Sequence, residues 1–178
     1  GNTEDIRSRF KGRREIDLEG ATVYPAFNDA HSHFIQTAQG LRHVDLRGAT
    51  SIDEVVERLQ KHYNQYEPSF IIGDGWDQTI WEEKTLPVND KLNEAFPDIP
   101  VYLSRVDFHA VWVNDRAIEL IGLQPDDPTI PAGEALMTEN GQFTGIFLEN
   151  TCSRFNVSIP PMKDSELIDC ILSLQEMC

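Results

Sequence analysis

The sequence predicts a fold of the α/β or α+β class, in which strands and helices alternate along the chain. Short apolar runs bounded by Gly or Pro predict strands at 70–73 and 101–105. Longer segments with apolar residues every three or four positions predict helices at 51–66 and 163–178. With 178 residues and 40% hydrophobic content, the chain is long enough for one domain, or for a domain with a small appendage.

The first predicted elements are strands. Residues 1–22 are highly charged, and the alternation of Ile16 and Leu18 predicts a short strand there. The run over 22–27 turns apolar, so we expect a buried strand that delivers the polar residues after it.

The clearest helix is expected over residues 51–66. Ser51 followed by Glu54 is the pattern of a capping box, which satisfies backbone amides at a helix start. Apolar residues recur on one face of this segment, and Pro68 follows its end.

The remaining elements follow from similar signals. Asn114 is expected to cap a helix that ends at Gly122, and Asn140-Gly141 is a hairpin turn. Short helical and strand patterns at 89–96 and 101–105, and an amphipathic helix at 163–178, complete the list.

The formal charge of −15 disfavours some partners. Because nucleic acids and anionic lipids repel an acidic protein, we expect neither as a partner. No apolar run approaches the roughly 20 residues of a membrane span, so no membrane association is expected. The 3 cysteines form no CxxC pair, which indicates neither a disulfide framework nor a thiolate metal site and favours a reducing, cytoplasmic setting.

The most informative stretch for chemistry is "YPAFNDAHSHF", Tyr24 to Phe34. On an extended strand His31 and His33 would face the same side, because alternate residues share a face. Imidazole nitrogen is a ligand that zinc prefers, and Asp29 could hydrogen-bond a ring or help to bind a metal. The alternative is a pair of exposed or hydrogen-bonded histidines without a metal.

The same stretch resembles the opening strand of the amidohydrolase superfamily, usually written P-G-F-x-D-x-H-x-H. Residues 71–123 ("IIGDGWDQTIW…") and 140–150 ("NGQFTGIFLEN") resemble the amidohydrolase 3 branch, which includes uncharacterised metal-dependent hydrolases and enzymes like N-substituted formamide deformylase. The chain departs from the pattern at three glycine or proline positions, which here hold Ala26, Phe108 and Phe143.

The resemblance implies a fold and a division of the chain. It implies a fragment of a (β/α)₈-type barrel with a large α+β insertion. Residues 1–22 would be a remnant of an N-terminal β-domain, and 23–43 the first barrel strand with its HxH motif. Residues 44–150 would be an inserted substrate lobe, and 151–178 a return loop and helix toward a second barrel strand. A complete barrel takes about 250 residues, so we expect a chain that is cut at both ends.

The resemblance also implies roles for single residues. His31 and His33 would be ligands of a divalent metal, expected to be zinc, and Asp29 and Glu149 would lie close to it. Four residues of the lobe would contact substrate: Trp76, Asp77, Trp81 and His109. Each has a structural alternative, because tryptophans commonly pack in cores, His109 could be buried, and Glu149 could be a solvated carboxylate. His43 and His62 are assigned no function.

The expected function is part of a metal-dependent hydrolase that cleaves an amide or cyclic amide C–N bond through a metal-activated water. The later ligands and the general base of the family cannot be placed here, so the chain alone is expected to be catalytically incomplete. The alternatives are a non-catalytic binding module and a degenerate family member. We expect a small amide-like substrate, and a homo-oligomer that buries apolar surface.

Overall fold

The computed structural model describes residues 2–177 and divides the chain into two units, residues 1–32 and 33–178. In the first unit, helix α1 (Thr3–Arg9) begins at Asn2, whose side chain accepts the Asp5 N–H at 2.8 Å. No strand occurs among residues 2–32 as the structure describes them. The β-structure expected for residues 1–22, including the alternation at Ile16 and Leu18, is therefore not formed.

The strand expected over residues 22–27 is also wrong. This segment pairs with no strand among residues 2–177, and the exposed fractions of Tyr24 and Phe27 are 76% and 102%. A β-strand is held by hydrogen bonds to a neighbouring strand and by burial of at least one face. The segment has neither, so its apolar composition alone does not make it a strand.

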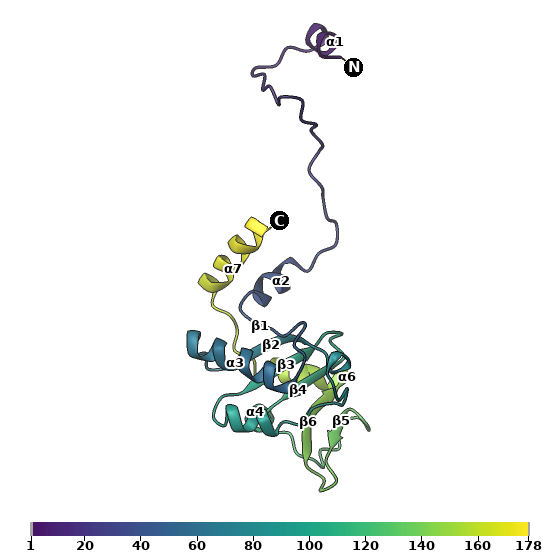
Figure 1. Ribbon diagram of the computed structural model, residues 1–178, viewed down its shortest axis with the longest axis vertical. Coiled ribbons are helices and arrows are strands. Elements are labelled where there is room, and N and C mark those ends of the chain that lie inside the picture. Colours follow the sequence, from purple (N-terminus) through teal and green to yellow (C-terminus); the bar gives the residue numbers. More distant parts are fainter. Residues whose placement is uncertain (1, 178) are drawn as a thin grey trace. The chain divides into compact units, whose positions relative to one another are not determined.

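The second unit is built on a mixed sheet of six strands (Figure 1). Their order across the sheet is β1-β2-β3-β4-β6-β5, with β1–β3 parallel and β4 antiparallel to both of its neighbours. Strands β1, β2, β3 and β6 therefore run in one direction, and their carboxyl ends share one edge. The strands are β1 (Val44–Asp45), β2 (Ile71–Trp76), β3 (Val101–Arg105), β4 (Ala110–Val113), β5 (Ala135–Met137) and β6 (Phe143–Leu148).

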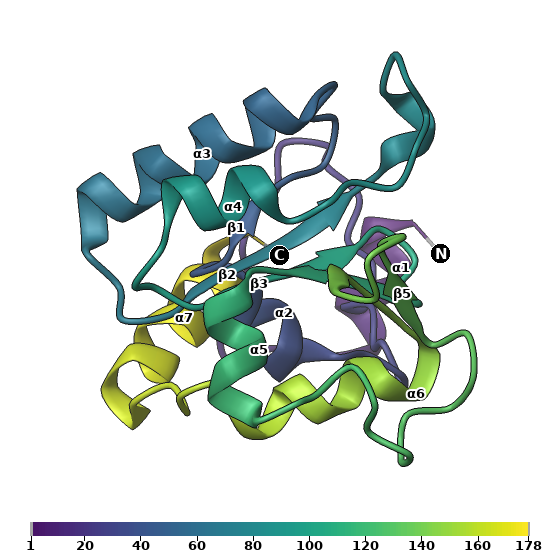
Figure 2. The same cartoon turned by 90° about the horizontal axis from the view of Figure 1, so that it is seen from below.

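Helices cover both faces of this sheet. Figure 2 shows α3 and α4 on one face and α5 and α6 on the other. Each face has its own hydrophobic cluster, one beneath α3 and α4 and one beneath α5 and the segment 149–157. The helical elements are α2 (Phe34–Gly40), α3 (Ile52–Tyr66), η1 (Gln78–Ile80), α4 (Asp90–Ala95), α5 (Asp115–Ile121), α6 (Glu149–Cys152), η2 (Ser153–Val157) and α7 (Asp164–Met177).

Helix α3 confirms the predicted start and half of the predicted capping box. Ser51 Oγ accepts the Glu54 N–H at 3.1 Å, as expected. The Glu54 carboxylate, however, accepts the N–H of Thr50 at 2.8 Å and not that of Ser51. Together with the bond from Arg58, this contact lowers the pKa of Glu54 to about 2.

Asn114 caps α5, as predicted, and does more than cap it. Its side chain is fully buried and accepts the N–H groups of Ala117 at 3.1 Å and Val101 at 2.9 Å. Its amide nitrogen donates to the carbonyls of Phe96 and Ile99, both at 2.9 Å. One side chain thus joins α5, β3 and the segment after α4.

Several other predicted elements are confirmed. Gly122 ends α5 in the left-handed conformation with φ 70°, and β3 covers the predicted range 101–105. The hairpin at Asn140-Gly141 joins β5 to β6, with the Thr138 N–H donating to the Gln142 carbonyl at 2.8 Å. Helix α7 packs on α2 through a small cluster of Ala38, Cys170 and Leu174.

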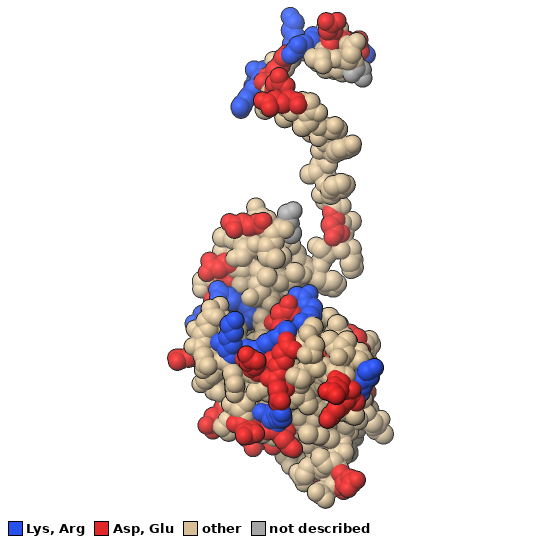
Figure 3. Space-filling model, in the orientation of Figure 1, with Lys and Arg blue, Asp and Glu red and all other residues tan. Residues whose placement is uncertain are grey.

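Acidic side chains gather over the face of the larger unit shown in Figure 3, with Lys and Arg among them. Several of these groups pair locally, as Arg47 does with Asp45 at 2.8 Å. Within residues 2–177, none of the helices has both the length and the apolar character needed to cross a bilayer.

Candidate functional site

Polar residues gather at the edge of the sheet where the parallel strands end. Asp77 follows β2, Arg105 ends β3 and Asp107 follows it, while His109 directly precedes β4 and Glu149 follows β6. In open α/β sheets, ligands commonly bind outside the carboxyl ends of the strands. We call these five residues the carboxyl-edge cluster.

His109 and Glu149 form the centre of the carboxyl-edge cluster. His109 Nδ1 lies 3.0 Å from Glu149 Oε2, and the Glu149 N–H donates to the His109 carbonyl at 3.0 Å. The side chains are 67% and 57% exposed. The hydrogen bond that the His109 ring makes to the Glu149 carboxylate raises the pKa of His109. Two candidate residues that lie 40 positions apart in the sequence are thus brought together, on the surface and not in the core.

Glu149 and the residue that precedes His109, Phe108, have an unusual backbone conformation. Phe108 has φ 61° and Glu149 has φ 48°, both in the left-handed region that favours glycine. A non-glycine residue there costs roughly 1–2 kcal/mol. Such strain is found preferentially at functional sites, where the surrounding structure maintains it.

Arg105 and Asp77 flank the pair. Arg105 Nη1 lies 3.4 Å from Asp107 Oδ2, and its buried Nε has no hydrogen-bond partner within the described part of the chain. Asp77 accepts the N–H of Thr79 at 2.9 Å and its hydroxyl at 2.6 Å, and these bonds lower the pKa of Asp77 with a smaller contribution from Arg105. The Asp77 carboxylate therefore caps η1, whatever further contacts it makes.

Trp76 and Trp81 lie in the core. Their exposed fractions are 0% and 5%, and the Trp76 indole N–H donates to the Leu103 carbonyl at 2.9 Å. The Trp81 indole N–H donates to the Ala49 carbonyl at 3.0 Å. Neither ring is accessible in this structure, and both side chains pack in the hydrophobic core. The Trp76 carbonyl accepts the N–H of Val106, which lies between Arg105 and Asp107 of the carboxyl-edge cluster.

The two histidines of the HxH motif lie in a different setting. His31 belongs to the unit 1–32, where its N–H donates to Asp29 Oδ1 at 3.0 Å. His33 is the N-cap residue of α2 in the other unit, and its carbonyl accepts the Thr37 N–H at 2.9 Å. The expectation that one strand places both rings on one side is wrong, because no strand forms there.

A metal ion requires several donor side chains that lie close together. Among residues 2–177, no three His, Cys, Asp or Glu side chains are grouped to hold a metal ion. A catalytic zinc site takes about three protein ligands and an open position for water. The described residues therefore do not form a complete catalytic zinc site by themselves.

Sequence reasoning missed a second polar group, because it assigned no function to His43. His43 Nδ1 lies 2.5 Å from Asp74 Oδ2, and the Ser104 hydroxyl donates to the other oxygen of Asp74. Burial tends to raise the pKa of Asp74, but the bonds from His43 and Ser104 outweigh it and lower that pKa. Asp74 and Ser104 are register partners on β2 and β3. The only signal for this contact was strand pairing, which the sequence did not show.

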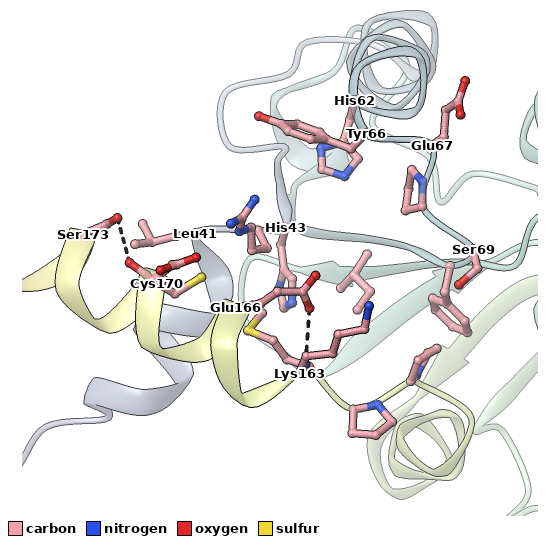
Figure 4. A pocket seen from close by; sticks show the side chains of 18 of the residues that line it. Leu41, His43, His62, Tyr66, Glu67, Ser69, Lys163, Glu166, Cys170 and Ser173 are labelled. Atoms are coloured by element: carbon pink, nitrogen blue, oxygen red, sulfur yellow. Dashed lines mark hydrogen bonds between the residues drawn. The ribbon is translucent and has the colours of Figure 1, made fainter.

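His43 also borders a cavity of the second unit with a volume of about 950 Å³ (Figure 4). Its lining comes from α3, through His62 and Tyr66, and from α7, through Glu166 and Cys170. Both signs of charge line it, so its composition does not indicate one class of ligand.

The fold is similar to part of two solved structures, of which the chain covers 29% and 28%. It is similar to the crystal structure of an uncharacterized metal-dependent hydrolase from Pyrococcus furiosus, with a TM-score of 0.60 and 30% identity over 86% of this chain. The matching hydrolase from Pyrococcus horikoshii OT3 has a TM-score of 0.60 and 31% identity. The model of the amidohydrolase family matches residues 14–166, so the chain belongs to that family. The family resemblance expected from the sequence is confirmed.

Two relatives of the chain are considerably longer than the chain itself. YtcJ of Bacillus subtilis is 26% identical over the whole chain, which corresponds to 34% of that protein. The N-substituted formamide deformylase of Arthrobacter pascens is 30% identical over 84% of the chain and 28% of the enzyme. The chain thus spans about a third or less of the relatives that it matches.

Proposed function

We propose that the chain is part of a metal-dependent amidohydrolase that cleaves a non-peptide C–N bond, in an amide or cyclic amide, through a metal-activated water. Family membership over residues 14–166 supports a hydrolase, and the carboxyl-edge cluster is the observation that carries the proposal. The placement of His109 against Glu149 at the carboxyl ends of the strands is typical of a ligand site.

The finer architecture is also a proposal. The chain would be part of a (β/α)₈-type barrel, and residues 44–150 would be the substrate lobe inserted into it. The six-stranded sheet and its two hydrophobic clusters lie almost entirely within that range, which supports a lobe with its own core. Residues 151–178 would lead back to the barrel.

His109 would bind the reacting amide. With Nδ1 held by Glu149, the ring presents Nε2 to a ligand, and the raised pKa of His109 favours a proton on that nitrogen. A protonated Nε2 can donate a hydrogen bond to a carbonyl oxygen, which stabilises the negative charge that develops there during hydrolysis. Glu149 would hold the ring in this orientation.

The metal would be zinc, held in part by His31 and His33 with Asp29 nearby, and it would supply the activated water. Because residues 2–177 hold at most part of its ligand set, the chain by itself would bind zinc weakly and turn over little substrate. Glu149 lies in contact with His109. We therefore assign it to the orientation of His109 and not to the metal.

The metal assignment is tested by titration of Zn²⁺ into the wild-type chain, His31→Ala and His33→Ala, followed by calorimetry. Each substitution is expected to weaken zinc binding about tenfold or more, while His62→Ala, on α3, leaves it unchanged. Zinc binding that is the same in all four proteins would contradict the role of the HxH motif.

The proposal that this chain alone is catalytically incomplete is tested by assaying the zinc-loaded protein with a panel of amides and cyclic amides. We expect no turnover above the zinc-only control. Turnover that disappears with His31→Ala would show a complete active site and contradict this part of the proposal. Amide binding that depends on His109, without any zinc binding, would favour the non-catalytic binding module instead.

A further inference from the structure

We propose that Phe108, which directly precedes His109 of the carboxyl-edge cluster, is a specificity-determining residue of this site. Its ring would contact a flat apolar group of a ligand whose amide is held by His109 and Glu149. The inference rests on the proposed function of that pair and adds the chemical class of ligand: neutral amides with a ring-sized apolar group.

The first observation is that Phe108 is a large apolar side chain left in water. Its exposed fraction is 73%, so burial of the ring contributes little to folding. The same residue has φ 61°, a conformation that destabilises the folded chain for a side chain of this size. Glycine or asparagine would form the same turn at a lower cost. The turn therefore does not explain why phenylalanine is present.

The second observation is that the turn is fixed and cannot relieve the strain. The Phe108 N–H donates to the Arg105 carbonyl at 3.0 Å, and the His109 N–H donates to Asp107 Oδ1 at 3.1 Å. At the start of the turn, the Val106 N–H donates to the carbonyl of buried Trp76 at 3.0 Å. These bonds fix the backbone of the turn that carries Phe108 directly before His109 in the chain.

The third observation is where the strained residues lie. Glu67 is the C-cap residue of α3, which accounts for its conformation, whereas Phe108 directly precedes His109 and Glu149 is hydrogen-bonded to it. The non-glycine residues with positive φ among the described residues are Glu19, Glu67, Lys84, Phe108 and Glu149. Convergence of two such residues on one histidine is expected where binding, and not folding, sets the residue type.

The chemistry of the surroundings narrows the ligand. Phe108 offers a ring face or edge, against which planar apolar groups pack favourably. The exposed carboxylates of Asp107 and Glu149 belong to the carboxyl-edge cluster together with His109 and disfavour an anionic ligand. A neutral amide with a planar apolar substituent satisfies both conditions.

Benzamide and acetamide are suitable probes, because both are neutral primary amides and they differ in the phenyl ring. Titration of the wild-type chain, followed by ¹H–¹⁵N NMR, is expected to show benzamide binding roughly fivefold more tightly than acetamide. Phe108→Asn and Phe108→Gly are expected to abolish this preference and to leave acetamide affinity unchanged. Their urea midpoints are expected not to fall, because both residues tolerate the left-handed conformation.

Lys84→Gly is the matched control, since Lys84 is exposed and has φ 49°. It is expected to relieve similar strain without changing the affinity for either probe. His109→Ala is expected to lower the affinity for both probes, which tests the proposed function separately. Suppose that His109→Ala lowers the affinity for both probes while Phe108→Asn still binds benzamide more tightly than acetamide. The inference about Phe108 is then overturned, and the proposed function stands. Equal wild-type affinities, or binding of neither probe, would also overturn it.

Discussion

The two histidine regions of this chain differ in how the backbone supports them. His109 lies in the segment that joins β3 to β4 of the six-stranded sheet. Its carbonyl, its N–H and its ring are all hydrogen-bonded to other residues. His31 and His33 follow a segment that pairs with no strand among residues 2–177. The HxH motif is by far the more recognisable in sequence, yet the less recognisable His109 has the defined surroundings.

The difference shows that a motif specifies the type of side chain, whereas strand pairing specifies its geometry. The alternation of faces that would place His31 beside His33 exists only on a paired strand. The pair His109–Glu149 depends on β4 and β6 being adjacent, which brings together residues that lie 40 positions apart in the sequence.

The largest loss of stability is expected from removing the buried side chain of Trp76, which directly precedes Asp77 of the carboxyl-edge cluster. Trp76→Ala deletes a fully buried ring and leaves the Leu103 carbonyl without its donor, so unfolding should become easier by about 3–5 kcal/mol. Phe27→Ala, in the other region, removes an exposed aromatic ring and should change stability by less than about 0.5 kcal/mol. Urea unfolding measures both. Comparable losses for the two variants would contradict the contrast drawn above.

The next effect is expected at Asn114, which joins α5 to the sheet. Asn114→Ala removes the helix cap and leaves buried backbone groups unbonded, so the loss should be about 2–3 kcal/mol by thermal or urea unfolding. Asn156→Ala, at an exposed position, is the control and should be nearly neutral. An Asn114 variant as stable as the wild type would show that the cap can be replaced by water.

A smaller effect is expected at the Asp74 carboxylate. Asp74→Asn weakens the bonds from His43 and Ser104 and should destabilise the protein by about 1–3 kcal/mol. The pKa of Asp74 is lowered in the folded state. Its contribution is therefore present above the ordinary aspartate pKa of about 3.9 and is lost as the pH falls through the lower folded value. Exposed Asp126→Asn should keep the wild-type acid unfolding profile, and an unchanged profile in Asp74→Asn would refute this account.

The smallest effect is expected at the exposed pair itself. Glu149 raises the pKa of His109, so Glu149→Gln should bring the NMR titration of the His109 ring back to lower pH, while Glu139→Gln leaves it unchanged. Because the folded pKa is raised, the stabilisation is fully present below the unfolded histidine value of about 6.5. It is lost as the pH rises through the folded value. A His109 titration that does not respond to Glu149→Gln would mean that the pair does not persist in solution.

Local signals in the sequence predicted much of the larger unit. The cap residues Ser51 and Asn114, the stop at Gly122 and the turn at Asn140-Gly141 all act within a few residues, and all are confirmed. The first region failed because an apolar run such as 22–27 is necessary for a strand but not sufficient. A strand also needs a neighbour, and composition does not reveal one.

The candidate site was predictable in its residues but not in its contacts. His109 and Glu149 could be singled out by resemblance, and their hydrogen bond could not, since it depends on the register of β4 and β6. The contact of His43 with Asp74 was missed for the same reason. Trp76 and Trp81 illustrate the opposite case, in which residues prominent in the family pattern pack in the core.

The two outermost strands of the sheet are short, since β1 has 2 residues and β5 has 3. A long, flat outer strand is a template on which further chains can add in register, as in amyloid, and short ones offer few positions for such growth. Concentrated solutions of this protein should therefore resist fibril formation through the sheet. Any specific assembly would form through side-chain surfaces, so it could be tuned by single surface substitutions without disturbing the strands.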